Sequence, residues 1–219
     1  MFSDRLSKAK SAALYMIRRR GTVILALATA ALLLLFSVTD FAQMCRQTRS
    51  EVLRLHILAD SDGAEAQALK LKVRDRILSV FSTRLSAAEN VRDAAELLTP
   101  LLGQIEETAE ETLRQNGCRD AVKAALTEEY FPERTYDGAT LPAGRYRALK
   151  IIIGRGEGHN WWCVLFPPLC VRSDDADAQA AAQAFIDKNG GVLYPKGEVK
   201  IKFKIVEAVE WLSGKIRKT

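Results

Sequence analysis

The sequence predicts an α+β fold, in which an N-terminal transmembrane or signal helix is followed by one globular domain with a mixed sheet and flanking helices. Three observations support this prediction. A long uncharged apolar run lies near the N-terminus, helical periodicity dominates residues 62–117, and strand-like alternation occurs before and after that region. With 219 residues, of which 48% are hydrophobic and 27% charged, the chain has the composition of a globular protein.

The apolar run comprises residues 21–38, GTVILALATAALLLLFSV, and is long enough to cross a hydrocarbon core as one helix. The basic leader before it, residues 1–20, accounts for the whole net charge of +5. By the positive-inside rule, this leader stays in the cytoplasm and the residues after Val38 are translocated. The nearest signal-cleavage patterns, at residues 37–39 and 40–42, are poor matches, so retention and removal of the helix both remain open.

The charge distribution also bears on the class of partner. After Arg20 the chain is formally neutral, with equal numbers of basic and acidic side chains. Binding to nucleic acid needs a clustered cationic face that displaces counterions. The composition supplies no such face, so we expect no nucleic-acid partner.

A strand and a helix are predicted at the start of the globular domain. The segment EVLRLHILAD, residues 51–60, alternates with the period of two that is typical of a strand. Asp62 and Glu65 form a capping box that begins a helix. The apolar stripe of this helix recurs at three- and four-residue spacing, at Ala66, Leu69, Val73, Ile77 and Val80.

Two shorter helices are predicted next. A second capping signal lies at residues 86–89, SAAE, before an apolar helical pattern. Pro100 interrupts that pattern, and a proline inside a helix costs about 3 kcal/mol, whereas at the first helical position it costs almost nothing. We therefore expect a separate helix that begins at Thr99–Pro100 and runs to Gly117.

Residues 50–171 are predicted to form the globular domain, whose second half is mainly sheet. Strands are expected in AVKAALTEEYF, YRALKIIIG and WWCVLF, with GRGEGHN as a hairpin loop between the last two. Residues 172–219 form a C-terminal extension. In it we expect a helix from Asp174 to Lys188 that Asn189–Gly191 stops, a lysine-rich strand EVKIKFKIV, and a helix from about Val206.

Catalytic and metal-binding interpretations centre on GHNWWCVLFPPLC, residues 158–170. His159 and Cys163 could act as base and nucleophile, and with His56 and Cys170 they could bind zinc. Their spacing matches neither a nucleophile motif nor paired zinc ligands, so we expect no enzyme activity, metal or cofactor. Cys163 and Cys170 flank a Pro-Pro pair, and two alternatives remain open for them: a disulfide or two buried thiols.

Two groups of residues are candidates for contact with a partner. Trp161 and Trp162 are adjacent in a strand, so their side chains point to opposite faces, and aromatic residues are frequent anchors at interfaces. The alternative is that both indoles lie in the core. The first candidate group is His159, Asn160, Trp161 and Trp162. The second group lies on the helix after Asp62 and comprises Lys70, Lys72, Arg74 and Asp75. The alternative for this second group is that it forms a solvated helix face.

Two long blocks, RLHILADSDGAEAQALKLKVRDRIL and LPAGRYRALKIIIGRGEGHNWWCVLFPPLC, resemble the stage II sporulation protein R family. The resemblance implies a signalling protein that is made in the forespore and exported into the space between forespore and mother cell, either membrane-anchored or released by signal cleavage. It further implies that the protein activates a membrane-embedded aspartic protease of the mother cell, which then processes a pro-sigma factor. Nothing is transferred beyond Cys170. The alternative function is an exported hydrolase that uses His159 and Cys163 on cell-wall or peptide substrates.

Overall fold

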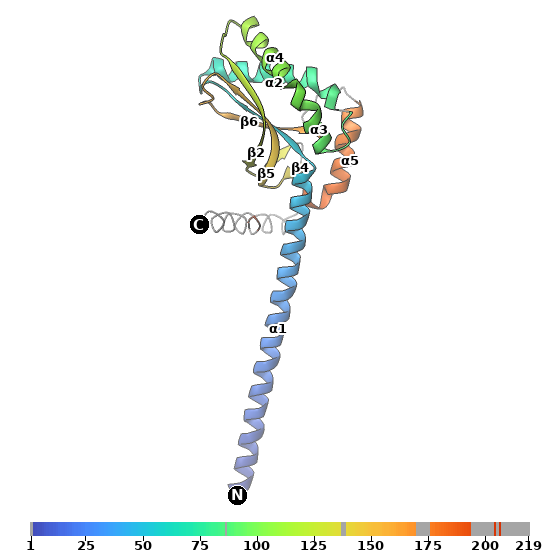
Figure 1. Ribbon diagram of the computed structural model, residues 1–219. Helices are drawn as coiled ribbons and strands as arrows, with labels where there is room; N and C mark the ends of the chain where they lie inside the picture. The colour runs from blue at the N-terminus through green and yellow to red at the C-terminus, as the bar shows by residue number, and fades with distance from the viewer. Residues whose placement is uncertain are drawn as a thin grey trace. The chain divides into compact units, whose positions relative to one another are not determined.

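The computed structural model describes residues 2–85, 87–136, 139–169 and 176–193, together with Lys204 and Val206. The chain divides into two compact units, Met1–Gln43 and Met44–Thr219. Figure 1 shows the long N-terminal helix α1, Phe2–Ser50, and the helices and strands that follow it.

Helix α1 confirms the predicted apolar N-terminal helix. Its part Arg19–Ser50 is long and apolar enough to cross a membrane, with a mean hydropathy of 2.4 in its most apolar window. Large apolar side chains along it are exposed, including Leu25 at 68% and Phe36 at 70%. Exposed apolar side chains are unfavourable in water and favourable in hydrocarbon. The helix also continues past Val38, where the apolar run of the sequence ends.

The globular unit is built on a four-stranded sheet with the order β2-β5-β1-β6. Strand β1 (Leu53–Leu58) is parallel to β5 (Gly144–Ile153) and antiparallel to β6 (Asn160–Phe166). Strand β2 (Val122–Phe131) pairs with β5 in antiparallel fashion at one edge. This arrangement confirms the predicted mixed sheet.

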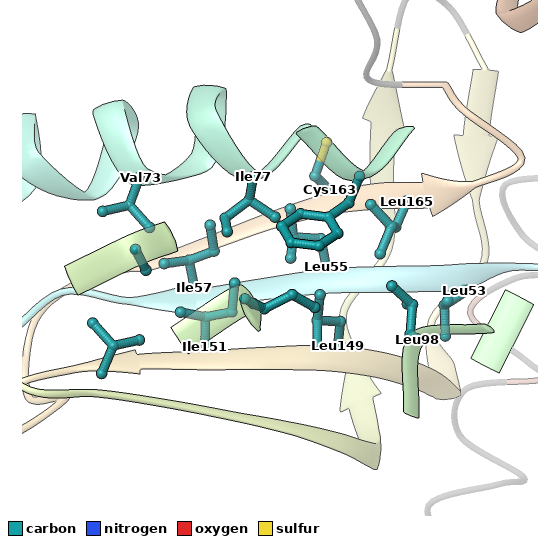
Figure 2. Close-up of a cluster of buried hydrophobic side chains, with 14 of the residues drawn as sticks. Leu53, Leu55, Ile57, Val73, Ile77, Leu98, Leu149, Ile151, Cys163 and Leu165 are labelled. Atoms are coloured by element: carbon teal, nitrogen blue, oxygen red, sulfur yellow. The ribbon is translucent and has the colours of Figure 1, made fainter. Parts of the chain in front are cut away.

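One face of this sheet packs against three helices, α2 (Ala64–Leu85), α3 (Val91–Leu98) and α4 (Leu102–Gln115). Figure 2 shows Val73 and Ile77 of α2 beside the apolar side chains of the strands. The predicted stripe of α2 is confirmed at three positions and continues through two further apolar residues. The buried apolar residues of α2 in the described chain are Leu69, Val73, Ile77, Phe81 and Leu85. Their removal from water supplies most of the stabilisation of this layer.

The helix boundaries near Pro100 agree with the prediction, but the cap of α3 differs from it. Asn90 is the N-cap, and its side-chain Oδ1 accepts from the amides of Arg92 and Asp93. The predicted cap, Ser86, lies outside the described residues. Pro100 lies in the short 3-10 helix η1, Thr99–Leu101, which separates α3 from α4. There its missing amide costs no helical hydrogen bond.

The second face of the sheet is also partly covered. Strands β3 (Arg134–Tyr136) and β4 (Ala139–Leu141) form a hairpin after β2, and α5 (Ala176–Leu193) contributes Phe185 to this side. Strand β1 is therefore buried on both faces, which includes the two polar side chains Arg54 and His56. The buried cluster on this face comprises Val52, Phe131, Leu141, Tyr146, Ala148, Val164 and Phe185.

The prediction that GRGEGHN forms a hairpin loop is wrong. Strands β5 and β6 are not neighbours, because β1 lies between them. Residues 154–159, which we call the glycine loop, instead cross the end of β1. Gly154 and Gly156 have φ angles of 57° and 66°, a region that glycine occupies without strain.

The predicted stop of this helix at Asn189–Gly191 is wrong, because α5 continues to Leu193. The reason is that the Asn189 side chain bonds within the helix and to a neighbouring one: Nδ2 donates to Phe185 O, and Oδ1 accepts from Thr48 Oγ1 at 2.9 Å. Most of the predicted strand at residues 198–206 lies outside the described residues. Lys204 is helical, which contradicts a strand there, and Val206 is helical as predicted.

Candidate functional site

Two carboxylates at the end of β1 hold the glycine loop in place. Asp60 accepts hydrogen bonds from the main-chain N, Nε and Nη2 of Arg155, at 3.0 to 3.2 Å. Asp62 accepts from the main-chain N of His159 at 2.6 Å and from its Nδ1. These hydrogen bonds to Arg155 lower the pKa of Asp60 below its ordinary value, so this carboxylate is ionised at neutral pH.

Lys70 fastens the same loop from the side of α2. Its ammonium donates to His159 O at 2.8 Å and to Gln67 Oε1 at 2.6 Å. The residue is only 3% exposed, and this burial lowers the pKa of its ammonium. Lys70 therefore does not lie on a solvated helix face, which was the alternative to a partner contact. Its long aliphatic part packs inward, while the charged end satisfies a main-chain carbonyl.

Trp161 and Arg74 join the two groups of candidate contact residues. The Arg74 guanidinium carbon lies 4.4 Å from the centre of the Trp161 ring, a cation–π geometry. Arg74 Nη2 is 2.6 Å from Asp75 Oδ1, and the Asp75 side chain is 61% exposed. Lys72 is not part of this group, because its Nζ bonds to Asn116 Oδ1 at the end of α4. We define the α2–β6 surface as Arg74, Asp75, His159 and Trp161.

Trp162 points to the opposite face of the sheet, as the strand geometry predicts. Its ring centre lies 6.0 Å from that of His56 and 6.3 Å from that of Phe131, and the Arg134 guanidinium lies over it at 4.7 Å. Both tryptophans are half-buried. The two indoles therefore each pack against one core cluster and keep part of their surface accessible.

A polar cluster that spans all four strands surrounds His56. Its Nδ1 is 2.6 Å from Glu129 Oε2 on β2, and its Nε2 is 2.7 Å from Asn160 Oδ1 on β6. The other oxygen of Glu129 accepts from Lys150 Nζ on β5 at 2.5 Å. Burial alone would raise the pKa of Glu129, but the hydrogen bonds from Lys150 and His56 outweigh it and lower that pKa.

Because the Glu129 pKa is lower in the folded than in the unfolded chain, its contribution to stability is present above the ordinary glutamate pKa of 4.5. This stabilising contribution is lost as the pH falls from 4.5 through the lower pKa that Glu129 has in the folded state. We expect Glu129→Gln to reduce the free energy of unfolding at neutral pH by roughly 1 kcal/mol or less. Denaturant titrations from neutral to acid pH should then show a smaller loss of stability in the variant. Equal losses in both proteins would contradict this prediction.

The two residues of the hydrolase hypothesis, His159 and Cys163, are both bonded to other side chains in the structure. Cys163 is disulfide-bonded, so its sulfur is not a thiolate nucleophile in this structure, and its predicted partner Cys170 lies outside the described residues. Cys118 has a free thiol. The ring of His159 is bonded to Asp62 through Nδ1. Within the described ranges, no three His, Cys, Asp or Glu side chains are grouped as metal ligands would be.

Sequence reasoning missed two members of the polar cluster, Glu129 and Lys150. Both lie in strands whose alternation was recognised, but nothing in the local pattern marks them. His56 and Glu129 are 73 residues apart in the chain, and they meet only because β2, β5 and β1 are adjacent in the sheet. The available signal was an ionisable residue on each of three predicted strands.

Comparison with known proteins supports the family resemblance of the two sequence blocks that form this region. The family model described as Stage II sporulation protein R matches residues 49–176, more than half of the chain. The Stage II sporulation protein R of Bacillus subtilis (strain 168) is 36% identical over 120 residues, which cover 55% of this chain and 54% of that protein. The chain thus spans about half the length of this relative. No solved structure matches this chain. The chain belongs to the stage II sporulation protein R family.

Proposed function

We propose that this protein is an exported signal of endospore formation that activates a membrane-embedded aspartic protease of the mother cell, which then processes a pro-sigma factor. The observation that carries the proposal is membership of the stage II sporulation protein R family, which indicates a role in sporulation. Export from the forespore, the identity of the protease and its substrate belong to the proposal.

The N-terminal helix supports a location at or beyond the membrane. A helix of this length and apolarity acts as a membrane anchor or an export signal. The basic leader favours a cytoplasmic N-terminus, so the globular unit would lie on the far side of the membrane. That location would place it in the space between forespore and mother cell, where it could meet a membrane protease from outside.

The proposed action is binding rather than catalysis. An activator shifts a two-state protease only by the difference between its affinities for the active and the inactive state. The α2–β6 surface supports such a contact, because it combines a half-buried tryptophan with an arginine stacked on it. Tryptophan and arginine are enriched among residues whose truncation costs 2 kcal/mol or more of binding free energy.

Two substitutions test this surface in membranes that contain the full chain, the candidate protease and its precursor. Trp161→Phe retains an aromatic ring under Arg74, and Asp75→Lys reverses an exposed charge. We expect each to lower the rate of precursor processing by up to about tenfold, because Trp161→Phe removes part of an anchor side chain and Asp75→Lys places a second cation beside Arg74. A tenfold change corresponds to about 1.4 kcal/mol. The unfolding midpoint should remain close to that of the unchanged protein.

The matched control is Arg92→Glu, which makes an equally large charge change on the exposed face of α3 and should leave processing unchanged. Normal processing by both surface variants would exclude the α2–β6 surface as the contact. An absence of processing even with the unchanged chain would refute the activation proposal itself.

A further inference from the structure

Strand β2 is an end strand of the four-stranded sheet, and its outer edge pairs with no other described strand. The strand is ten residues long and pairs with β5 without a shift of register. The main-chain N–H and C=O groups along such an edge are a template on which a further strand can pair. The groups that occupy this edge therefore decide whether the sheet can be extended.

Two glutamates of α4 occupy the first amides of this edge. Glu110 Oε1 accepts from the main-chain N of Val122 at 3.1 Å, and Glu106 Oε1 accepts from the main-chain N of Ala124 at 2.8 Å. The two glutamates are four residues apart, a rise of about 6 Å along a helix, and two residues of a strand advance about 6.6 Å. Because these spacings match, carboxylates on one face of α4 meet successive outward amides of β2.

The alternation of the strand extends this pattern along β2. Main-chain groups of an antiparallel strand point alternately toward the neighbouring strand and away from it. Since the amides of Val122 and Ala124 point away from β5, the main-chain groups of Leu126 and Glu128 do so as well. Glu128 O accepts from Arg145 Nη2 at 2.9 Å. Charged side chains thus occupy outward main-chain groups on both sides of Leu126, which lies near the middle of the strand.

We infer that the outer edge of β2 is a pairing surface for a second copy of this chain, and that Glu106 and Glu110 keep this surface closed. Their carboxylate oxygens lie where the carbonyl oxygens of an added strand would have to bind. Two copies can pair along this edge only when the carboxylates move away, and the two sheets then become continuous. The inference goes beyond the proposed function and does not depend on the protease.

The residues of β2 fit a second copy of the same strand. Identical edge strands pair in antiparallel fashion about a two-fold axis. With this axis at Leu126, Lys123 of each copy lies opposite Glu129 of the other copy. Lys123 is exposed, and the Glu129 side chain is 21% exposed. Opposite charges that face each other across two strands stabilise their pairing, so this register provides two symmetry-related charge pairs.

Removal of both carboxylates should open this surface. In Glu106→Ala combined with Glu110→Ala, the amides of Val122 and Ala124 lose their side-chain acceptors, and carbonyl oxygens of a second copy can replace them. We expect this variant of the full chain, in detergent micelles, to dimerise with a dissociation constant at least about tenfold below that of the unchanged chain. Each hydrogen bond gained corresponds to about threefold to tenfold in affinity. Sedimentation equilibrium measures both constants.

Two further variants separate the occupied amides from the change of charge. Glu107→Ala combined with Glu111→Ala removes the same charge from exposed positions of α4 and should leave the dissociation constant unchanged. Glu106→Gln combined with Glu110→Gln removes the charge but keeps an oxygen acceptor at both positions, so it should dimerise less than the alanine variant. Dimerisation of either variant as strong as that of the Glu106 and Glu110 alanine variant would overturn the inference.

Amide hydrogen exchange shows whether the dimer forms at this edge. In the alanine variant, exchange at the Leu126 amide should become slower at the protein concentrations at which the dimer forms. Addition of Ala124→Pro removes one outward donor of the edge, where proline is tolerated, and should reverse the dimerisation. A dimer that leaves the exchange of Leu126 unaltered, or that persists with the proline, would lie at another surface and would overturn the inference.

The unchanged chain and a single substitution decide the matter if the double alanine variant does not fold. In the unchanged chain, the Ala124 amide should exchange at least about tenfold more slowly than the Leu126 amide, because only the former is bonded to a carboxylate. Equal exchange rates would overturn the inference. Glu106→Ala frees one amide and should lower the dissociation constant of the dimer by about threefold or more. A constant equal to that of the unchanged chain would also overturn the inference.

Discussion

Replacing Gly158 with alanine is expected to destabilise the globular unit by on the order of 3 kcal/mol, because no space exists for the added methyl group. An ideal Cβ at Gly158 would lie 2.2 Å from the carbonyl oxygen of Ser61 and 2.6 Å from its carbonyl carbon. These are main-chain atoms, so they cannot move aside as a flexible side chain would. The Gly158 amide also donates to Ala59 O at 2.9 Å, which fixes the loop against the end of β1.

Gly103→Ala is the matched control for this substitution. Gly103 lies in α4, and nothing lies within 4 Å of the position that its Cβ would occupy. Alanine there should be neutral or stabilising by up to about 1 kcal/mol, because it restricts the unfolded chain. Denaturant unfolding of the full chain, monitored by tryptophan fluorescence, measures the stability of both variants. Equal stability of the two variants would mean that the glycine loop does not pack as closely as the structure shows.

Arg54→Ala is the second substitution with a large expected effect. Arg54 is fully buried, its guanidinium lies 4.5 Å from the Phe131 ring centre and 5.1 Å from that of Tyr146, and Nε donates to Cys163 O at 2.9 Å. Alanine would leave a cavity between two aromatic rings and remove the cation–π contacts. We expect the free energy of unfolding to fall by about 3 to 5 kcal/mol.

Arg54→Met separates volume from charge, since methionine fills much of the same space without a guanidinium. It should lose less stability than the alanine variant, because the cavity is smaller and no charge has to be buried. Arg92→Ala, on the exposed surface of α3, should stay within about 0.5 kcal/mol of the unchanged protein. An Arg54→Ala variant as stable as Arg92→Ala would show that the buried guanidinium contributes nothing net.

Some elements could be predicted because their signals are local. The stripe of α2 repeats every three to four residues, and Pro100 marks the boundary between α3 and α4 without reference to the rest of the fold. Other predictions failed where a distant contact outweighed a local signal. Asn189–Gly191 is a helix-stop sequence, yet α5 continues because Thr48 and Phe185 satisfy the Asn189 side chain within a helix. Lys70 looks like a surface residue of an amphipathic helix, but the His159 carbonyl provides a buried acceptor for it.

The sequence by itself determined the apolar N-terminal helix, the α+β class, the opposite directions of Trp161 and Trp162, and the family. Each depends on composition, on the period of a helix or strand, or on a contiguous run of residues. Only the tertiary structure decided that β1 lies between β5 and β6, and with it the position of the glycine loop and the meeting of His56 with Glu129 and Asn160. Strand order depends on pairing between segments that lie far apart in the chain, and the alternation within one strand is the same whichever neighbours it has.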